Sequence, residues 1–114
     1  MIWLGVFGNL GPIDAGNGVK SYTDKTTGTS WTVHTGSNPA NGIGTVYSFL
    51  PTGGNLQNFN NANLLPFIEY LASFDAGVGT TTLVSIQAGT EAVMVNSPGA
   101  SATFTTSAYE ISGS

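Results

Sequence analysis

The chain has no cysteine and no arginine, and its 114 residues include only two lysines. The absence of cysteine excludes disulfides and thiolate metal sites. Six acidic residues bring the formal net charge to -4. A chain so poor in cations is not expected to bind nucleic acid or an anionic membrane surface, because both interactions depend on clustered lysine and arginine.

Long apolar runs are also missing. No run approaches the roughly 20 residues that span a bilayer. The first residues lack the basic segment and the small-residue cleavage site of a signal peptide, so the sequence by itself predicts a cytosolic product. The length fits a single domain, residues 1–114, and leaves no room for a second one.

Glycine, serine, threonine and asparagine take the place of the missing charges. Glycine alone contributes 16 residues, and only 7% of the chain is charged. This mixture is typical of secreted β-rich proteins that bind neutral carbohydrate.

Alternating apolar side chains and clusters of turn residues divide the chain into short strands. We predict strands over residues 1–6, 19–23, 30–35, 45–50, 81–91, 101–106 and 108–112. Residues 19–35 are expected to form a hairpin whose turn covers residues 24–29. His34, the only histidine, has no partner at metal-ligand spacing and is predicted to be an exposed strand residue. No metal site and no cofactor are predicted.

One helix is predicted after the strand over residues 45–50. Its apolar stripe has the spacing i, i+3, i+4 and i+7 and consists of Leu64, Phe67, Ile68 and Leu71. Asn63 is the expected N-cap, which places Pro66 in the first turn, where its missing N–H is harmless. The fold class expected from these elements is all-β: an antiparallel β-sandwich of jelly-roll type with one packed α-helix.

The stretch Ser85-Ile86-Gln87-Ala88-Gly89-Thr90-Glu91 ends on an isolated carboxylate. In an extended strand, Val84, Ile86 and Ala88 would share an apolar face, and Gln87 and Glu91 the other one. Glycine at position 89 would let a bulky ligand approach the glutamate closely.

These residues resemble a signature of glycoside hydrolase family 12, the endo-β-1,4-glucanases and xyloglucanases. Gln87-Ala88-Gly89-Thr90-Glu91 is similar to the family's Q-x-G-T-E, and Met1-Ile2-Trp3-Leu4-Gly5 is similar to the end of its E-x-M-I-W-L-G. Further similar segments follow in the family's order: Gly11-Pro12-Ile13, Val46-Tyr47-Ser48-Phe49 and Phe67-Ile68-Glu69-Tyr70-Leu71. The resemblance implies that the chain corresponds to about the C-terminal half of the family fold, as a single partial domain.

The resemblance also implies roles for individual residues. Glu91 is the expected general acid/base of a retaining glycosidase, which needs two carboxyl groups about 5–5.5 Å apart. Met1, Trp3, Pro12 and Gln87 are the expected substrate-binding residues, with Trp3 as a platform on which a sugar ring stacks. The nucleophile would lie two positions before Met1, so this chain is expected to lack it and to be inactive alone.

Two departures from the family pattern bear on substrate preference. The acid/base of the family is usually followed by P-F, whereas this chain reads Ala92-Val93, and a tyrosine that often precedes the strand is replaced by Thr82. Asp14, Asp24, Asp75, Glu69 and Glu110 carry the other carboxylates, and none of them has motif support as a stand-in nucleophile.

Three functions stay open at this point. The first is retaining, endo-acting hydrolysis of cellulose, mixed-linkage glucan or xyloglucan by a secreted enzyme. The second is a catalytically dead paralogue that binds glucan or occupies an inhibitor, and the third is a β-sandwich with a structural role alone. Because half a sandwich exposes sheet edges and apolar faces, we also expect self-association of the isolated chain.

Overall fold

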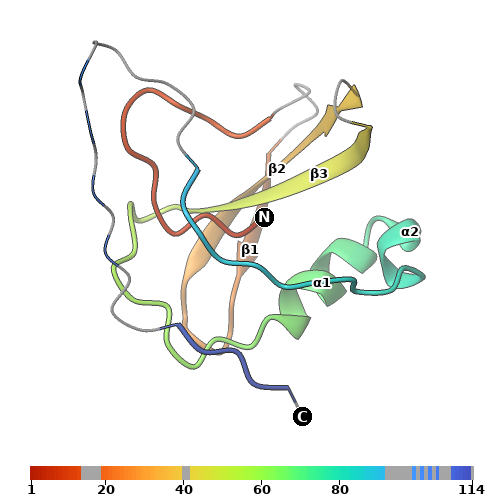
Figure 1. The fold of residues 1–114 in the computed structure, drawn as a ribbon. Coiled ribbons are helices and arrows are strands. Elements are labelled where there is room, and N and C mark those ends of the chain that lie inside the picture. The colour runs from red at the N-terminus through yellow and green to blue at the C-terminus, as the bar shows by residue number, and fades with distance from the viewer. Residues whose placement is uncertain are drawn as a thin grey trace. The chain divides into compact units, whose positions relative to one another are not determined.

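All the regular secondary structure that the structure describes lies before residue 80. The computed structural model describes residues 1–13, 19–39, 42–91, 99, 101, 103, 105 and 109–113. Its elements are β1 (Lys20–Thr23), β2 (Ser30–Asn38), β3 (Ile43–Pro51), α1 (Leu65–Ala72) and α2 (Ala76–Gly79) (Figure 1). The chain divides into two compact units, Met1–Thr81 and Thr82–Ser114.

The three strands form one antiparallel sheet in the order β1-β2-β3. The register pairs Tyr22 with Trp31 and Val33 with Phe49, and it shifts between Ser37 and Asn38. The predicted hairpin over residues 19–35 and the predicted strand over residues 45–50 are therefore confirmed. Both strands are longer than predicted, because β2 continues to Asn38 and β3 runs from Ile43 to Pro51.

The turn between β1 and β2 explains why the hairpin forms here. The Asp24 amide donates to the Thr29 carbonyl and the Gly28 amide donates to the Asp24 carbonyl, each at 2.8 Å. Gly28 has a φ of +73°, a conformation that glycine adopts without strain. The sequence thus supplies an acceptor at the start of the turn and glycine where the backbone is left-handed.

Helix α1 covers one side of the sheet, as its apolar stripe predicts. Phe67 is its buried residue, and Pro66 lies in the first turn. The expected N-cap was one residue early, because Leu64 occupies that position without a side-chain cap. Asn63 instead accepts a hydrogen bond from the Leu65 amide at 3.0 Å.

The core of the first unit is small and largely aromatic. Trp31, Val33, Phe49 and Phe67 are buried in it. The Phe67 ring meets the Trp31 and Phe49 rings edge-on, with centroids 5.6 and 5.1 Å apart. Edge-to-face contacts of this kind add to the free energy gained by removing the rings from water.

Three other predicted features differ from the structure. Residues 1–6 form no strand: Ile2 makes a single parallel bridge to Phe49, and the Leu4 carbonyl accepts from the Leu56 amide instead. Residues 74–80, for which no helix was predicted, contain the short helix α2, which the Asp75 side chain caps by accepting from the Gly77 amide. Residues 82–91 form no strand either.

The predicted strand over residues 81–91 is wrong because a strand needs a partner for its backbone N–H and C=O groups. The ladders in the described part of the chain join only β1, β2 and β3. Val84 and Ile86, expected on a buried face, are 93% and 43% exposed. The described residues of the two predicted final strands, 101, 103, 105 and 109–112, are in no strand, and the others lie outside the described residues.

The antiparallel sheet with a helix packed on it agrees with the predicted all-β class. No second sheet is present among the residues described, so the jelly-roll sandwich stays a prediction. No helix in the described part of the chain is long and apolar enough to cross a bilayer.

Candidate functional site

The two faces of the sheet differ in what they carry. Side chains alternate along a strand, so Trp31 and Val33 of β2 point toward α1 while Thr32 and His34 point away from it. On β3, Phe49 lies on the helix side and Ser48, which pairs in register with His34, lies on the other. We call the side away from α1 the distal face, and define it by Met1, Trp3, Thr32, His34 and Ser48.

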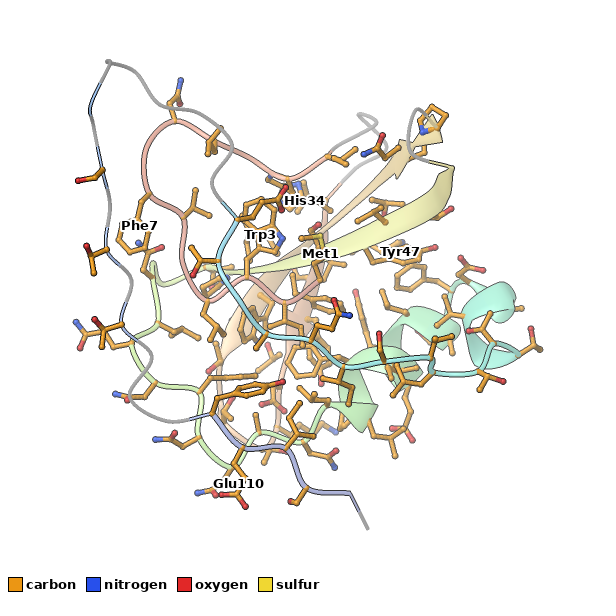
Figure 2. The ribbon with its side chains drawn as sticks, in the orientation of Figure 1. Met1, Trp3, Phe7, His34, Tyr47 and Glu110 are labelled. Carbon is orange, nitrogen blue, oxygen red and sulfur yellow. The ribbon has the colours of Figure 1, made fainter. Side chains whose placement is uncertain are left out.

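Met1 and Trp3 reach the distal face because the start of the chain adds to the edge of β3. The Met1 nitrogen donates to the Tyr47 carbonyl at 2.5 Å. The Phe49 amide donates to the Met1 carbonyl, and the Trp3 amide donates to the Phe49 carbonyl, each at 2.9 Å. Ile2, between them, packs against the core on the helix side, so its two neighbours point the other way (Figure 2).

Pro12 lies on the side of the distal face because the next residue, Ile13, packs closely against Gly36 of β2. A Cβ built on Gly36 of β2 would lie 2.5 Å from the carbonyl oxygen and from the Cγ2 atom of Ile13. Gly36 is buried and alternation places it on the distal face, so Ile13 lies directly over that face. Pro12, which precedes it, is half-buried.

The distal face contains polar atoms without partners in the described structure. The Trp3 indole Nε1 and the Ser48 hydroxyl are both buried and form no hydrogen bond with any described residue. Buried polar groups are normally paired, so such atoms indicate where a ligand or a water molecule binds. The signal is not specific to this face, because Trp31 Nε1 in the core has the same property.

His34 lies in β2, as predicted, but it is half-buried where an exposed side chain was expected. Its register with Ser48 explains the difference, because Ser48 is 1% exposed and His34 is its neighbour on the distal face. The described residues contain no group of three or more histidine, aspartate or glutamate side chains that could hold a metal ion.

Gln87 and Glu91 belong to the second unit. Both side chains are exposed, and neither residue lies in regular secondary structure. The alternation that was expected to place them on one sheet face therefore does not apply, since these residues form no strand. Their roles in binding and in proton transfer stay predictions.

The two aspartates described in the first unit have structural partners. Asp24 is fully buried and accepts hydrogen bonds from the Thr26 amide, the Thr27 amide and the Thr27 hydroxyl. Burial alone raises the pKa of Asp24, but these hydrogen bonds, led by that of the Thr27 hydroxyl, outweigh it and hold the pKa below its ordinary value. Asp24 therefore stays ionised and stabilises the turn of the hairpin.

Asp75 accepts hydrogen bonds from the Tyr47 hydroxyl and, at 2.9 Å, from the Gly77 amide. The hydrogen bond to Asp75, with burial and the charge of Asp75, raises the pKa of Tyr47 to about 12. Tyr47 points to the helix side of β3, so this pair lies away from the distal face. The pair was not predicted, since the two residues are 28 positions apart in the chain.

Comparison with known proteins identifies the family. The glycosyl hydrolase family 12 profile matches residues 1–112. The chain is 41% identical over 113 residues to a protein of Aspergillus terreus named "Probable xyloglucan-specific endo-beta-1,4-glucanase A". It is 35% identical over 112 residues to xyloglucan-specific endo-beta-1,4-glucanase A of Emericella nidulans. These matches cover 98% of this chain.

A third relative has a different name. The chain is 36% identical over 110 residues to inactive glycoside hydrolase XLP1 of Phytophthora nicotianae, and that match covers 96% of the chain. The chain spans 41–43% of the length of these three relatives. No solved structure matches it significantly. Because the family profile covers nearly all of its residues, the chain belongs to glycosyl hydrolase family 12.

Proposed function

We propose that this chain is part of a secreted, retaining glycoside hydrolase that cuts internal β-1,4 bonds of a glucan, with xyloglucan as the substrate class. The observation that carries the proposal is the family match over residues 1–112, which includes Glu91 within its Q-x-G-T-E motif. Two of the relatives are named for xyloglucan-specific endoglucanase activity, which favours xyloglucan over unsubstituted cellulose.

Glu91 acts in this proposal as the general acid that protonates the departing glycosidic oxygen, and then as the base that activates water. A carboxylate contributed by the preceding part of a family-12 domain attacks the anomeric carbon and forms the glycosyl-enzyme intermediate. A jelly-roll sandwich would bring the two carboxyl groups within the short distance that retention requires. The exposed Glu91 side chain is free to meet a substrate.

The distal face supplies the sugar contacts. Trp3 is held there by its backbone bond to Phe49 and presents an indole ring, onto which the C–H face of a pyranose can stack. Met1 lies beside it on the same face, and Pro12 adjoins the residue that covers Gly36. Gln87 is the proposed hydrogen-bonding residue of the second unit.

The second candidate function is glucan binding without hydrolysis. It is favoured by the similarity to the Phytophthora nicotianae relative, whose name calls it inactive. In that case Trp3 would still bind sugar, but replacing Glu91 would change no reaction rate.

The test is a hybrid in which this chain replaces the matching segment of the Aspergillus terreus relative. We expect the hybrid to hydrolyse xyloglucan with retention, and Glu91→Gln to lower kcat by about 10²–10⁴-fold, the usual contribution of a general acid. Glu110→Gln, which changes a glutamate outside the motif, is the matched control and is expected to leave kcat unchanged.

A second substrate separates a proton donor from a residue that merely maintains the structure. An aryl glycoside with an acidic phenol as its leaving group needs no protonation, so Glu91→Gln should form the glycosyl-enzyme from it at nearly the parental rate. A Glu91→Gln hybrid that hydrolyses xyloglucan as fast as the parent would exclude the role. A correctly folded hybrid that binds xyloglucan but does not hydrolyse it would favour the binding function.

A further inference from the structure

A hollow on the helix side of the sheet is lined by none of the residues assigned to the proposed reaction. It is formed between β1 with its following turn and helix α1, and has a volume of about 440 Å³. Pockets for small ligands usually have volumes of roughly 300–1,000 Å³. Its wall residues used below are Tyr22, Lys25, Glu69, Tyr70 and Ser73.

Two aromatic rings line the hollow and are held in place. The Tyr22 and Tyr70 rings have centroids 4.8 Å apart and planes inclined by 36°. Tyr22 packs edge-on against Phe67 of the core, with centroids 5.0 Å apart. The Tyr70 hydroxyl donates to the Ser21 carbonyl at 2.9 Å, which ties α1 to β1. Both rings are half-buried, so each keeps part of its surface accessible to a ligand.

The two charged side chains that line the hollow have opposite signs. Lys25 and Glu69 are exposed, with one positive and one negative charge. Asp24 is nearby, but its carboxylate is buried and bonded within its own turn. A hollow with one charge of each sign favours a neutral ligand with many hydroxyl groups over an anion or a cation.

The Tyr22 hydroxyl, close to Asp24 and Glu69, is a hydrogen-bond donor that a ligand could use. It forms no hydrogen bond with any residue that the structure describes, whereas the hydroxyls of Tyr47 and Tyr70 each have an acceptor. Burial, with the negative charges of Asp24 and Glu69, raises the pKa of Tyr22. The hydroxyl therefore stays protonated and available to a ligand oxygen at any physiological pH.

We propose that this hollow is a second, non-catalytic saccharide site that holds a short stretch of a neutral glucan. A pyranose ring would lie against Tyr22 and Tyr70, with its hydroxyl groups bonded to Tyr22, Lys25, Glu69 and Ser73. Such a site would keep the polymer on the protein while its reacting segment lies elsewhere. The choice of glucan rests on the proposed function, but the aromatic lining and the charge balance do not.

The experiment is a titration of the isotopically labelled 114-residue chain with cellohexaose and with xyloglucan oligosaccharide, followed by NMR. We expect the largest shift changes at the amides of β1 and the first two turns of α1. Tyr22→Phe removes only the hydroxyl, and the double variant Lys25→Ala/Glu69→Ala removes both charges without changing the net charge. Each is expected to raise Kd about tenfold, the effect of one or two lost hydrogen bonds, while leaving the thermal unfolding temperature nearly unchanged.

Trp3→Ala on the distal face is the control that separates the two sites. If it lowers affinity while both hollow variants bind like the parent, the second site is refuted and the proposed sugar contacts on the distal face are supported. Absence of shift changes at β1 and α1 with either oligosaccharide also refutes the second site. The two experiments can also disagree. If the chain binds an oligosaccharide in the hollow but the hybrid does not hydrolyse xyloglucan, the proposed reaction is contradicted and the second site is still supported.

Discussion

The two units of the chain use similar apolar sequences in different ways. In Met1–Thr81, alternating residues of β2 and β3 bury Trp31, Val33 and Phe49 against a helix. In Thr82–Ser114, the described stretch with the same alternation leaves Val84 and Ile86 exposed. Alternation therefore predicts which face of a strand is apolar, but a strand forms only where a partner is present to pair with it.

The difference matters because the most specific sequence motif lies in the second unit. Glu91 was identified by its place in the motif Gln87-Ala88-Gly89-Thr90-Glu91. It was not identified from a strand geometry, because these residues form no strand. The residues expected to contact the sugar ring, Met1 and Trp3, lie in the first unit and are fixed by backbone bonds to β3. The proposed sugar binding and the proposed proton transfer would thus depend on parts of the chain with different local order.

The largest expected effect is the difference in stability loss between two truncations to alanine, one in each unit. Trp31→Ala should lower the free energy of unfolding by about 3–5 kcal/mol, because a buried aromatic ring is replaced by a cavity. Val84→Ala should change it by less than about 0.5 kcal/mol, because the side chain is exposed. Urea denaturation of both variants measures the contrast, and a comparable loss in Val84→Ala would show that this segment is packed after all.

A smaller effect is expected from two glycines within the sheet. Gly36→Ala places a methyl group against the backbone of Ile13 and should destabilise the chain by about 1–3 kcal/mol. Gly44→Ala is the matched control, since no atom of the described residues lies within 4 Å of its Cβ position. A tolerated Gly36→Ala in the same denaturation assay would mean that residues 11–13 do not lie on the distal face.

The smallest effect concerns pH. The pKa of Tyr47 is raised to about 12 by its bond to Asp75, so the stabilisation from this bond is complete below pH about 10, the ordinary tyrosine pKa. It is lost as the pH rises through about 12. The same bond, with that of the Gly77 amide, lowers the pKa of Asp75, so in acid the contribution disappears as the pH falls below about 4.

An ultraviolet titration of the four tyrosines measures the alkaline step. It should include one group that ionises near pH 12, and Tyr47→Phe should remove that step while Tyr109→Phe leaves it in place. If the highest ionisation survives in Tyr47→Phe, the hydrogen bond to Asp75 does not form in solution.

Much of the first unit could be predicted because its determinants are local. The hairpin needs an acceptor at Asp24 and a glycine at position 28, and α1 needs an apolar stripe with proline in its first turn. The short helix α2 was missed because its main signal is a single cap, Asp75, within a glycine-rich stretch.

The rest depends on contacts between distant residues, which a local pattern does not contain. Residues 1–6 have the composition of a strand, yet after Trp3 their bonds go to Asn55 and Leu56. The burial of Asp24 and the bond from Tyr47 to Asp75 likewise follow from packing. For the candidate site, the motif identified Glu91, whereas the shared face of Met1 and Trp3 follows from their backbone bonds to β3.

The most direct test of the proposed role of Glu91 is a crystal structure of the Glu91→Gln hybrid with a bound xyloglucan oligosaccharide. The side chain of residue 91 is predicted to lie within about 2.6–3.2 Å of the oxygen of the scissile bond, with the Trp3 ring against a neighbouring sugar. A productively bound oligosaccharide whose scissile oxygen has another carboxyl group as its donor, with residue 91 pointing into solvent, would contradict the account.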